Sequence, residues 1–175
     1  TARRRAGVDD FIPEQEIDGV FEEVFKDVDI YQNDINLLRN RFVSPLSAIG
    51  PSVYKYYIMD TLLVEGIPCI DLAFVPFNSE SHGFTGHLYI KADSTHFIKW
   101  VQMTTPHDIN LNFVRTLSVT QTFTPAADGT PLLDKETLTA EMEITAQING
   151  VYVKREVSYE NYLLDEPARL ELFYQ

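Results

Sequence analysis

Two carboxylates, Asp60 and Asp71, have the spacing that best suits chemistry in this sequence. They lie on either side of Glu65-Gly66, which we interpret as a two-residue turn between antiparallel strands. Such a turn would place the carboxylates opposite each other, where like charges are unfavourable unless they share a proton or bind a cation. Shared carboxylates serve acid–base catalysis and metal-assisted hydrolysis. A longer turn, or two carboxylates that point apart into water, would remove this chemistry.

The histidines and the single cysteine form no recognisable site. The four histidines are His82, His87, His96 and His107. They contain no HxH or HExxH pair, and none is close to Cys69 in the sequence, so we predict no metal and no cofactor. Cys69 has no basic neighbour or helix N-terminus to lower its pKa, which favours a small buried residue over a nucleophile. The sequence also has no GxSxG, GxGxxG or phosphate-loop motif.

Three cationic residues, Lys99, Arg115 and Arg155, stand among apolar residues on strand-like stretches. Their long side chains could run along the apolar surface to water, or they could form local ion pairs. Alternatively, they could line a cavity and bind an acidic group. Side chains that reach water or form local ion pairs are the more economical interpretation, because they need no ligand.

The composition is that of a folded and acidic protein. The chain has 175 residues, of which 45% are hydrophobic and 12% aromatic, and its formal net charge is −12. This charge argues against nucleic acid or an anionic membrane as a partner. One cysteine excludes an internal disulfide, and no apolar run is long enough to form a membrane-spanning helix. Because the sequence begins with Thr1, we expect either a processed protein or a domain taken from a longer protein, and we favour the second.

A central hairpin over residues 84–101 must position the candidate residues. Apolar and polar residues alternate along its first strand, and Asp93-Ser94 is interpreted as a two-residue turn that places His87 opposite Trp100. That contact is more typical of packing than of a site. Further strands are predicted over residues 53–64, 67–75, 113–124, 140–148 and 151–159. Asn149-Gly150, between the last two, is the strongest local hairpin signal in the chain.

The two ends of the chain have different patterns. Residues 1–13 are predicted to form an extended arm, and residues 14–50 a helical segment. An apolar stripe with helical spacing runs over residues 17–28, and a second helix is expected to continue to Phe42. Residues 161–175 have only a weak pattern and are interpreted as a tail.

Together these elements predict an α+β fold dominated by strands, in one domain over residues 1–175. Its sheet, over residues 53–160, is an antiparallel meander of about seven or eight strands that curls into a half-barrel. One or two N-terminal helices are expected to pack on one face of that sheet.

Five segments, in order, resemble a domain of unknown function in outer-membrane proteins of Bacteroidetes. They are RFVSPLS, YKYYIMDT, CIDLAFVP, FTGHLYI and DINLNFV. The resemblance covers about residues 17–125. In that family the domain follows a carboxypeptidase-regulatory-like β-sandwich and precedes a predicted membrane β-barrel, which implies a soluble part on the periplasmic face of the outer membrane. A meander with FxGxLxI at its centre is also distantly similar to the half-barrel of periplasmic lipoprotein carriers.

Three functions are compatible with this sequence. The first is a non-catalytic binding or scaffolding module that holds a lipid, a lipoprotein or an envelope protein in the concave face of the sheet. Its apolar cavity would be lined by Phe84, Leu88, Phe97, Phe113, Leu117 and Phe123. The second is an envelope hydrolase that uses Asp60 and Asp71. The third is a structural spacer whose concave face is filled by its own chain.

Overall fold

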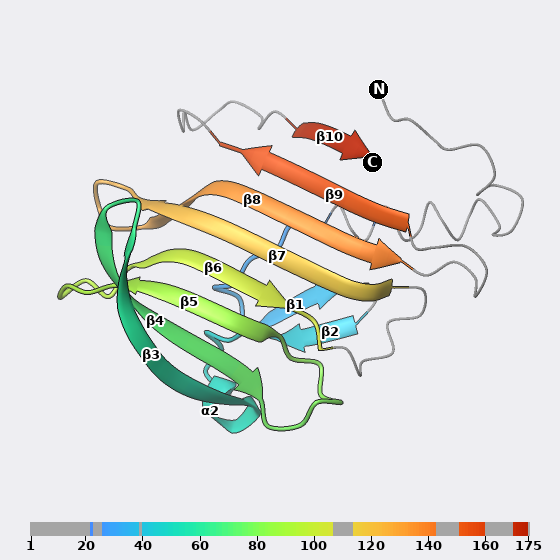
Figure 1. Cartoon of the computed structure of the whole chain (residues 1–175), viewed down its shortest axis with the longest axis horizontal. Helices are drawn as coiled ribbons and strands as arrows, with labels where there is room; N and C mark the ends of the chain where they lie inside the picture. Colours follow the sequence, from blue (N-terminus) through green and yellow to red (C-terminus); the bar gives the residue numbers. More distant parts are fainter. Residues whose placement is uncertain are drawn as a thin grey trace, which may run out of the picture.

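The computed structural model describes residues 22, 26–38, 40–106, 114–142, 151–159 and 170–174. Its main element is an eight-stranded sheet in which every strand pairs antiparallel with the next strand along the chain (Figure 1). The strands are β3 (Tyr54–Val64), β4 (Ile67–Pro76), β5 (Thr85–Lys91), β6 (Ile98–Thr104), β7 (Val114–Pro125), β8 (Pro131–Met142), β9 (Val151–Ser158) and β10 (Leu170–Tyr174). The predicted antiparallel meander is therefore confirmed, but two of its predicted parts differ. The strand predicted over residues 140–148 is β8, which begins at Pro131 and ends at Met142, and β10 lies within the predicted tail. The predicted Asn149-Gly150 turn lies outside the described residues. The sheet is open, with β3 and β10 as its edges.

The turn between β3 and β4 has the predicted length. Glu65 and Gly66 both have positive φ angles, 50° and 79°, as a two-residue turn between twisted strands requires. Val64 and Ile67 pair directly beside this turn. Farther along, the register shifts between Ile58 and Thr61, which marks a β-bulge in the edge strand.

The prediction of a two-residue turn at Asp93-Ser94 is wrong. Strand β5 ends at Lys91 and β6 begins at Ile98, so Trp100 lies opposite Tyr89 instead of His87. The physical reason is local, because the Asp93 carboxylate accepts hydrogen bonds from the backbone N–H and the hydroxyl of Thr95. This Asx-type turn lengthens the loop, and the register differs by two residues from the predicted one.

The N-terminal region differs from the helices that the sequence predicts. The second predicted helix is wrong, because residues 34–43 form the hairpin of β1 (Asp34–Leu37) and β2 (Asn40–Val43). The buried Ile35 and Leu37 alternate with polar residues, which is the period of a strand. A single short helix, α2 (Gly50–Val53), follows. Most of the helix predicted from residue 14 onward lies outside the described residues.

Residues 26–50, which we call the N-terminal segment, lie on the inner face of the sheet (Figure 1). Phe42 stacks on Phe84 with ring centroids 4.8 Å apart, and the ring of Tyr31 meets Phe123 edge-on at 5.8 Å. These contacts join the segment to the sheet in one apolar core cluster. The chain therefore covers much of this inner face with its own residues.

Two tyrosine hydroxyls of β3 donate hydrogen bonds to main-chain carbonyls of the N-terminal segment. The Tyr54 hydroxyl donates to the carbonyl of Val43 and accepts a hydrogen bond of 2.9 Å from the backbone N–H of Phe84. The Tyr56 hydroxyl donates to the carbonyl of Pro45 at 2.8 Å. Burial raises the pKa of Tyr54 well above its usual value. This tyrosine-rich strand thus joins the edge of the sheet to the N-terminal segment.

Candidate functional site

Each of the two candidate carboxylates has a hydrogen-bonding partner other than the second carboxylate. Asp60 is exposed in the bulge of β3, where its carboxylate accepts a hydrogen bond of 2.7 Å from the backbone N–H of Thr61. Asp71 lies on β4, opposite Tyr89 of β5, and its carboxylate is 2.7 Å from Nδ1 of His87. The turn has the predicted register as far as Thr61 opposite Ile70, but the bulge then places Met59 and Asp60 together opposite the single Asp71. The predicted one-to-one pair of Asp60 with Asp71 is therefore not formed in the strand ladder, and the chemistry of a shared carboxylate stays a prediction.

Asp71 instead belongs to a polar and aromatic row on the outer face. The rings of His87 and Tyr89 stack at 6.0 Å, and those of Tyr89 and Trp100 at 4.8 Å. Burial raises the pKa of Tyr89, with a further contribution from the charge of Asp71. A carboxylate beside an imidazole can orient it for proton transfer. Among the described residues, however, His87 makes no hydrogen bond to the serine, threonine or cysteine that nucleophilic catalysis would need.

The residues expected to line a cavity lie mainly in the core. Phe84, Leu88, Leu117 and Phe123 are all buried and belong to one cluster with Ile30, Leu37 and Phe42 of the N-terminal segment. Phe97 is half-buried and packs against this cluster. Phe113 lies outside the described residues. These side chains therefore share one apolar face, as the alternation of apolar residues predicted, and the chain's own residues pack on it.

All three cations that looked misplaced in the sequence form local ion pairs. Nζ of Lys99, a buried residue, donates to the carbonyl of Phe123 at 3.1 Å and lies 3.3 Å from the Glu65 carboxylate. Arg115 is exposed and reaches Glu141 on the neighbouring strand at 3.6 Å. The third, Arg155, is buried and pairs with Glu136. The local interpretation of these cations is confirmed.

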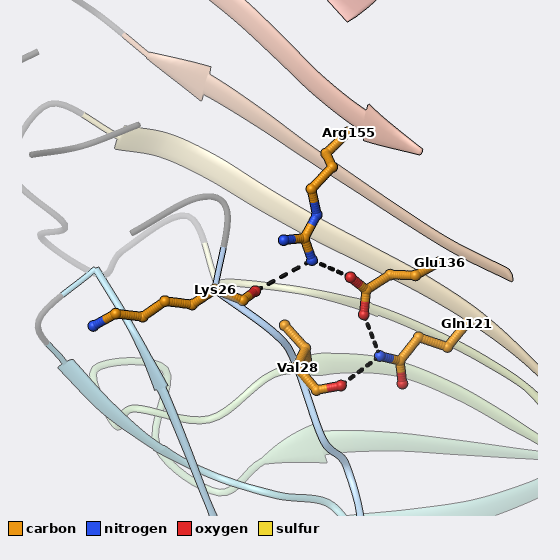
Figure 2. A network of polar contacts seen from close by, with 5 residues as sticks. All are labelled: Lys26, Val28, Gln121, Glu136 and Arg155. Carbon is orange, nitrogen blue, oxygen red and sulfur yellow. Dashed lines mark hydrogen bonds and ion pairs between the residues drawn. The ribbon is translucent and has the colours of Figure 1, made fainter. Parts of the chain in front are cut away.

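The ion pair of Arg155 is part of a buried polar network (Figure 2). Gln121 on β7 lies opposite Glu136 on β8, and its Nε2 donates to that carboxylate at 2.5 Å. The same amide donates to the carbonyl of Val28 at 2.7 Å, and Arg155 donates to the carbonyl of Lys26 at 3.2 Å. Side chains of β7 and β9 thus bind two main-chain carbonyls of the N-terminal segment, and Glu136 on β8, between them, accepts hydrogen bonds from both side chains.

The network has an energetic cost that its hydrogen bonds offset. Glu136 is only 3% exposed and Arg155 only 2%. Burial raises the pKa of Glu136, whereas the hydrogen bond from Gln121 and the charge of Arg155 lower it. Because a buried ion pair adds little net stability, the network acts mainly to fix where the N-terminal segment lies. This role is structural.

Sequence reasoning identified Arg155 but missed its partners. The sequence contained a signal for both partners, Gln121 and Glu136. Gln121 occupies an inward position of β7, between the buried Val119 and Phe123, and Glu136 lies two residues before the buried Leu138. A polar residue at an inward strand position needs a hydrogen-bonding partner.

A second feature that the sequence did not reveal is an exposed apolar patch at the edge strand β3. Eight large apolar residues of the described chain are exposed, and four of them lie on β3. Two more are near it in the chain or through a hydrogen bond: Ile49 precedes α2, which leads into β3, and the backbone N–H of Phe77 donates to the carbonyl of Val53. These six, which we call the edge patch, are Ile49, Tyr57, Ile58, Met59, Leu63 and Phe77. Ile58 is 78% exposed and Leu63 68%. Such a concentration differs from the scattered single apolar residues of an ordinary surface.

Two other kinds of site can be addressed for the described part of the chain. It contains no group of three or more histidine, cysteine, aspartate or glutamate residues that could hold a metal ion. None of the helices in this part has the length and apolar character needed to cross a membrane.

Comparison with protein families gives a match. The model of a family of unknown function, DUF5686, matches residues 16–162. Comparison with curated proteins and with solved structures gives no match. The expected relationship to a domain of unknown function is thereby confirmed at the level of the family.

Proposed function

The chain belongs to this family of unknown function, and we propose that it is a non-catalytic module that binds a partner protein. The observation that carries the proposal is the edge patch, in which six large apolar side chains are exposed around one strand. Exposed apolar surface of this kind is characteristic of protein interaction sites. The rest of the sheet, packed on the N-terminal segment, would serve as a rigid support.

The packing favours a protein over the other expected partners. A lipid or a lipoprotein acyl chain would need the apolar inner face, where Phe84, Leu88 and Leu117 are already buried against the chain's own residues. The net charge of −12 disfavours an anionic membrane surface. An envelope protein therefore remains the best-supported partner in this proposal.

We place this activity on the periplasmic face of the outer membrane, within a longer protein. The support is the resemblance of five ordered segments to the domain of outer-membrane proteins described above. In that setting the module would connect a membrane-bound protein to a second envelope protein. This placement is independent of the geometry of the edge patch.

The alternative of an envelope hydrolase has one specific observation in its favour, the 2.7 Å contact between Asp71 and His87. It predicts that His87→Gln abolishes a hydrolytic activity while the protein stays folded. A binding module predicts no such activity to lose.

The binding proposal is tested on the parent protein that carries this chain, in its native envelope. The double variant Ile58→Asp/Leu63→Asp should remove a complex that is visible by native electrophoresis of detergent extracts. A control variant, Tyr152→Asp, changes an exposed apolar residue away from β3 and should leave the complex intact. A complex that survives both changes, or is lost equally with both, would contradict the proposal.

A further inference from the structure

We infer that the partner docks on β3 as an added β-strand, so that an extended segment of that protein continues the sheet at this edge. The inference rests on the proposed binding function and specifies the chemistry of the partner. Three features of the described residues support it: the free edge, the two-sided exposure of apolar residues and the charge.

The first feature is the edge itself. Strand β3 has eleven residues and pairs on one side with β4, while no other described strand lies on its opposite side. Alternate backbone N–H and C=O groups on that side lack a strand partner. Another extended chain can satisfy these groups, and a lipid or a helix cannot do so in a regular way.

The second feature is that apolar residues are exposed on both faces of the edge. Ile58 lies opposite Leu72, which in turn lies opposite the buried Leu88, so Ile58 belongs to the inner face. Tyr57 lies opposite Ala73 on the outer face. A groove or a flat surface would cover only one of these faces. The side chains of an added strand alternate between both faces and can therefore contact both.

The third feature is charge. The chain has a net charge of −12, and the edge strand carries one exposed carboxylate, Asp60 in its bulge, and one exposed cation, Lys55, near its start, where Nζ lies over the Phe77 ring. A docking segment with lysine or arginine among alternating apolar residues is therefore favoured over an acidic one. The bulge divides the edge into residues 54–58 and 61–64, so the partner needs only about five residues in an extended conformation to match one part.

The test uses the full chain and a displayed library of random peptides as the probe. Peptides are selected on the wild type after removal of those that bind Ile58→Asp/Leu63→Asp. We expect enriched peptides to alternate apolar residues, to carry basic residues and to shift the NMR signals of β3 amides. N-methylation of alternate peptide nitrogens should weaken binding by about tenfold or more, because it removes main-chain hydrogen bonds.

Three results would overturn the inference: no enriched peptide, binding that N-methylation does not change, or signal shifts confined to other strands. These results are distinguishable from failure of the binding function itself. If the native complex still depends on Ile58 and Leu63 but the peptides are insensitive to N-methylation, the edge patch binds its partner through side chains alone.

Discussion

The inner face of β7 to β9 and the edge of β3 differ in what surrounds their side chains. On the inner face, Gln121 and Arg155 donate to main-chain carbonyls of the N-terminal segment, Gln121 also donates to Glu136, and all three side chains are buried. At the edge, Ile58 and Leu63 are exposed beside main-chain groups that lack a strand partner among the described residues. The first region is covered by the chain's own residues. The second has the composition of a surface that is completed by another molecule.

Because of this difference, the stability of the fold and the binding of a partner should depend on different residues. Groups that contact the N-terminal segment should determine the free energy of unfolding, whereas groups of the edge patch should determine association. Each variant below therefore has an expected effect on one property and little effect on the other.

The largest effect is expected from Glu136→Gln. The change leaves the guanidinium of Arg155 buried without its carboxylate, which should reduce the free energy of unfolding by about 3–5 kcal/mol. Urea denaturation measures this loss. The double variant Glu136→Leu/Arg155→Met should recover most of it, because both charges are then absent. A cost below about 1 kcal/mol for the single variant would show that the pair is not buried as described.

Two phenylalanines offer a matched comparison of the regions. Phe42 is fully buried against Phe84, so Phe42→Ala should cost about 3 kcal/mol in the free energy of unfolding. Phe77 is 57% exposed in the edge patch, so Phe77→Ala should cost about 0.5 kcal/mol or less. Equal costs for the two variants in thermal or urea unfolding would contradict the distinction between the regions.

The pH dependence tests the contact between β3 and the N-terminal segment. Because burial raises the pKa of Tyr54, the folded chain retains this proton at a pH where the unfolded chain loses it. The contribution of Tyr54 is therefore complete below about pH 10 and decreases as the pH rises above it. Tyr54→Phe should flatten that alkaline decrease in urea unfolding while costing about 1 kcal/mol at neutral pH. An unchanged alkaline slope would contradict the burial of this hydroxyl.

The smallest effect on stability is expected in the edge patch. Ile58→Lys and Leu63→Lys each place a charge where the side chain is already exposed, so unfolding should change by about 0.5 kcal/mol or less. Both variants should nevertheless weaken partner binding. A loss of stability comparable to that of Phe42→Ala would show that β3 is covered by the chain itself.

Much of the sheet could be predicted because its information is local. Alternating residues and the Glu65-Gly66 turn specify β3, β4 and β5 directly. The loop at Asp93 is longer than predicted because the Asp93 carboxylate accepts hydrogen bonds from Thr95, and this local turn competes with a two-residue turn. The hairpin at residues 34–43 is stabilised by burial against the sheet, which local propensity does not encode.

The candidate site was less predictable because it depends on long-range geometry. Asp60 and Asp71 do not form the predicted one-to-one pair because a bulge places Met59 and Asp60 together opposite Asp71, and nothing in YYIMDT identifies that bulge. Arg155 lies 129 residues from Lys26, so its contact could not be read from spacing. The exposure of Ile58 and Leu63 became apparent only once β3 was seen at the edge of the sheet.

The most direct test places one photo-crosslinking residue at a time in this protein within its own cells, at Tyr31 or at Leu63. From Tyr31, which contacts Phe123, we predict a crosslink within the chain to the β7 peptide. From Leu63 we predict a crosslink to a different polypeptide. A Leu63 probe that reacts only with its own chain, together with a Tyr31 probe that captures another protein, would contradict the central claim that β3 is the binding edge.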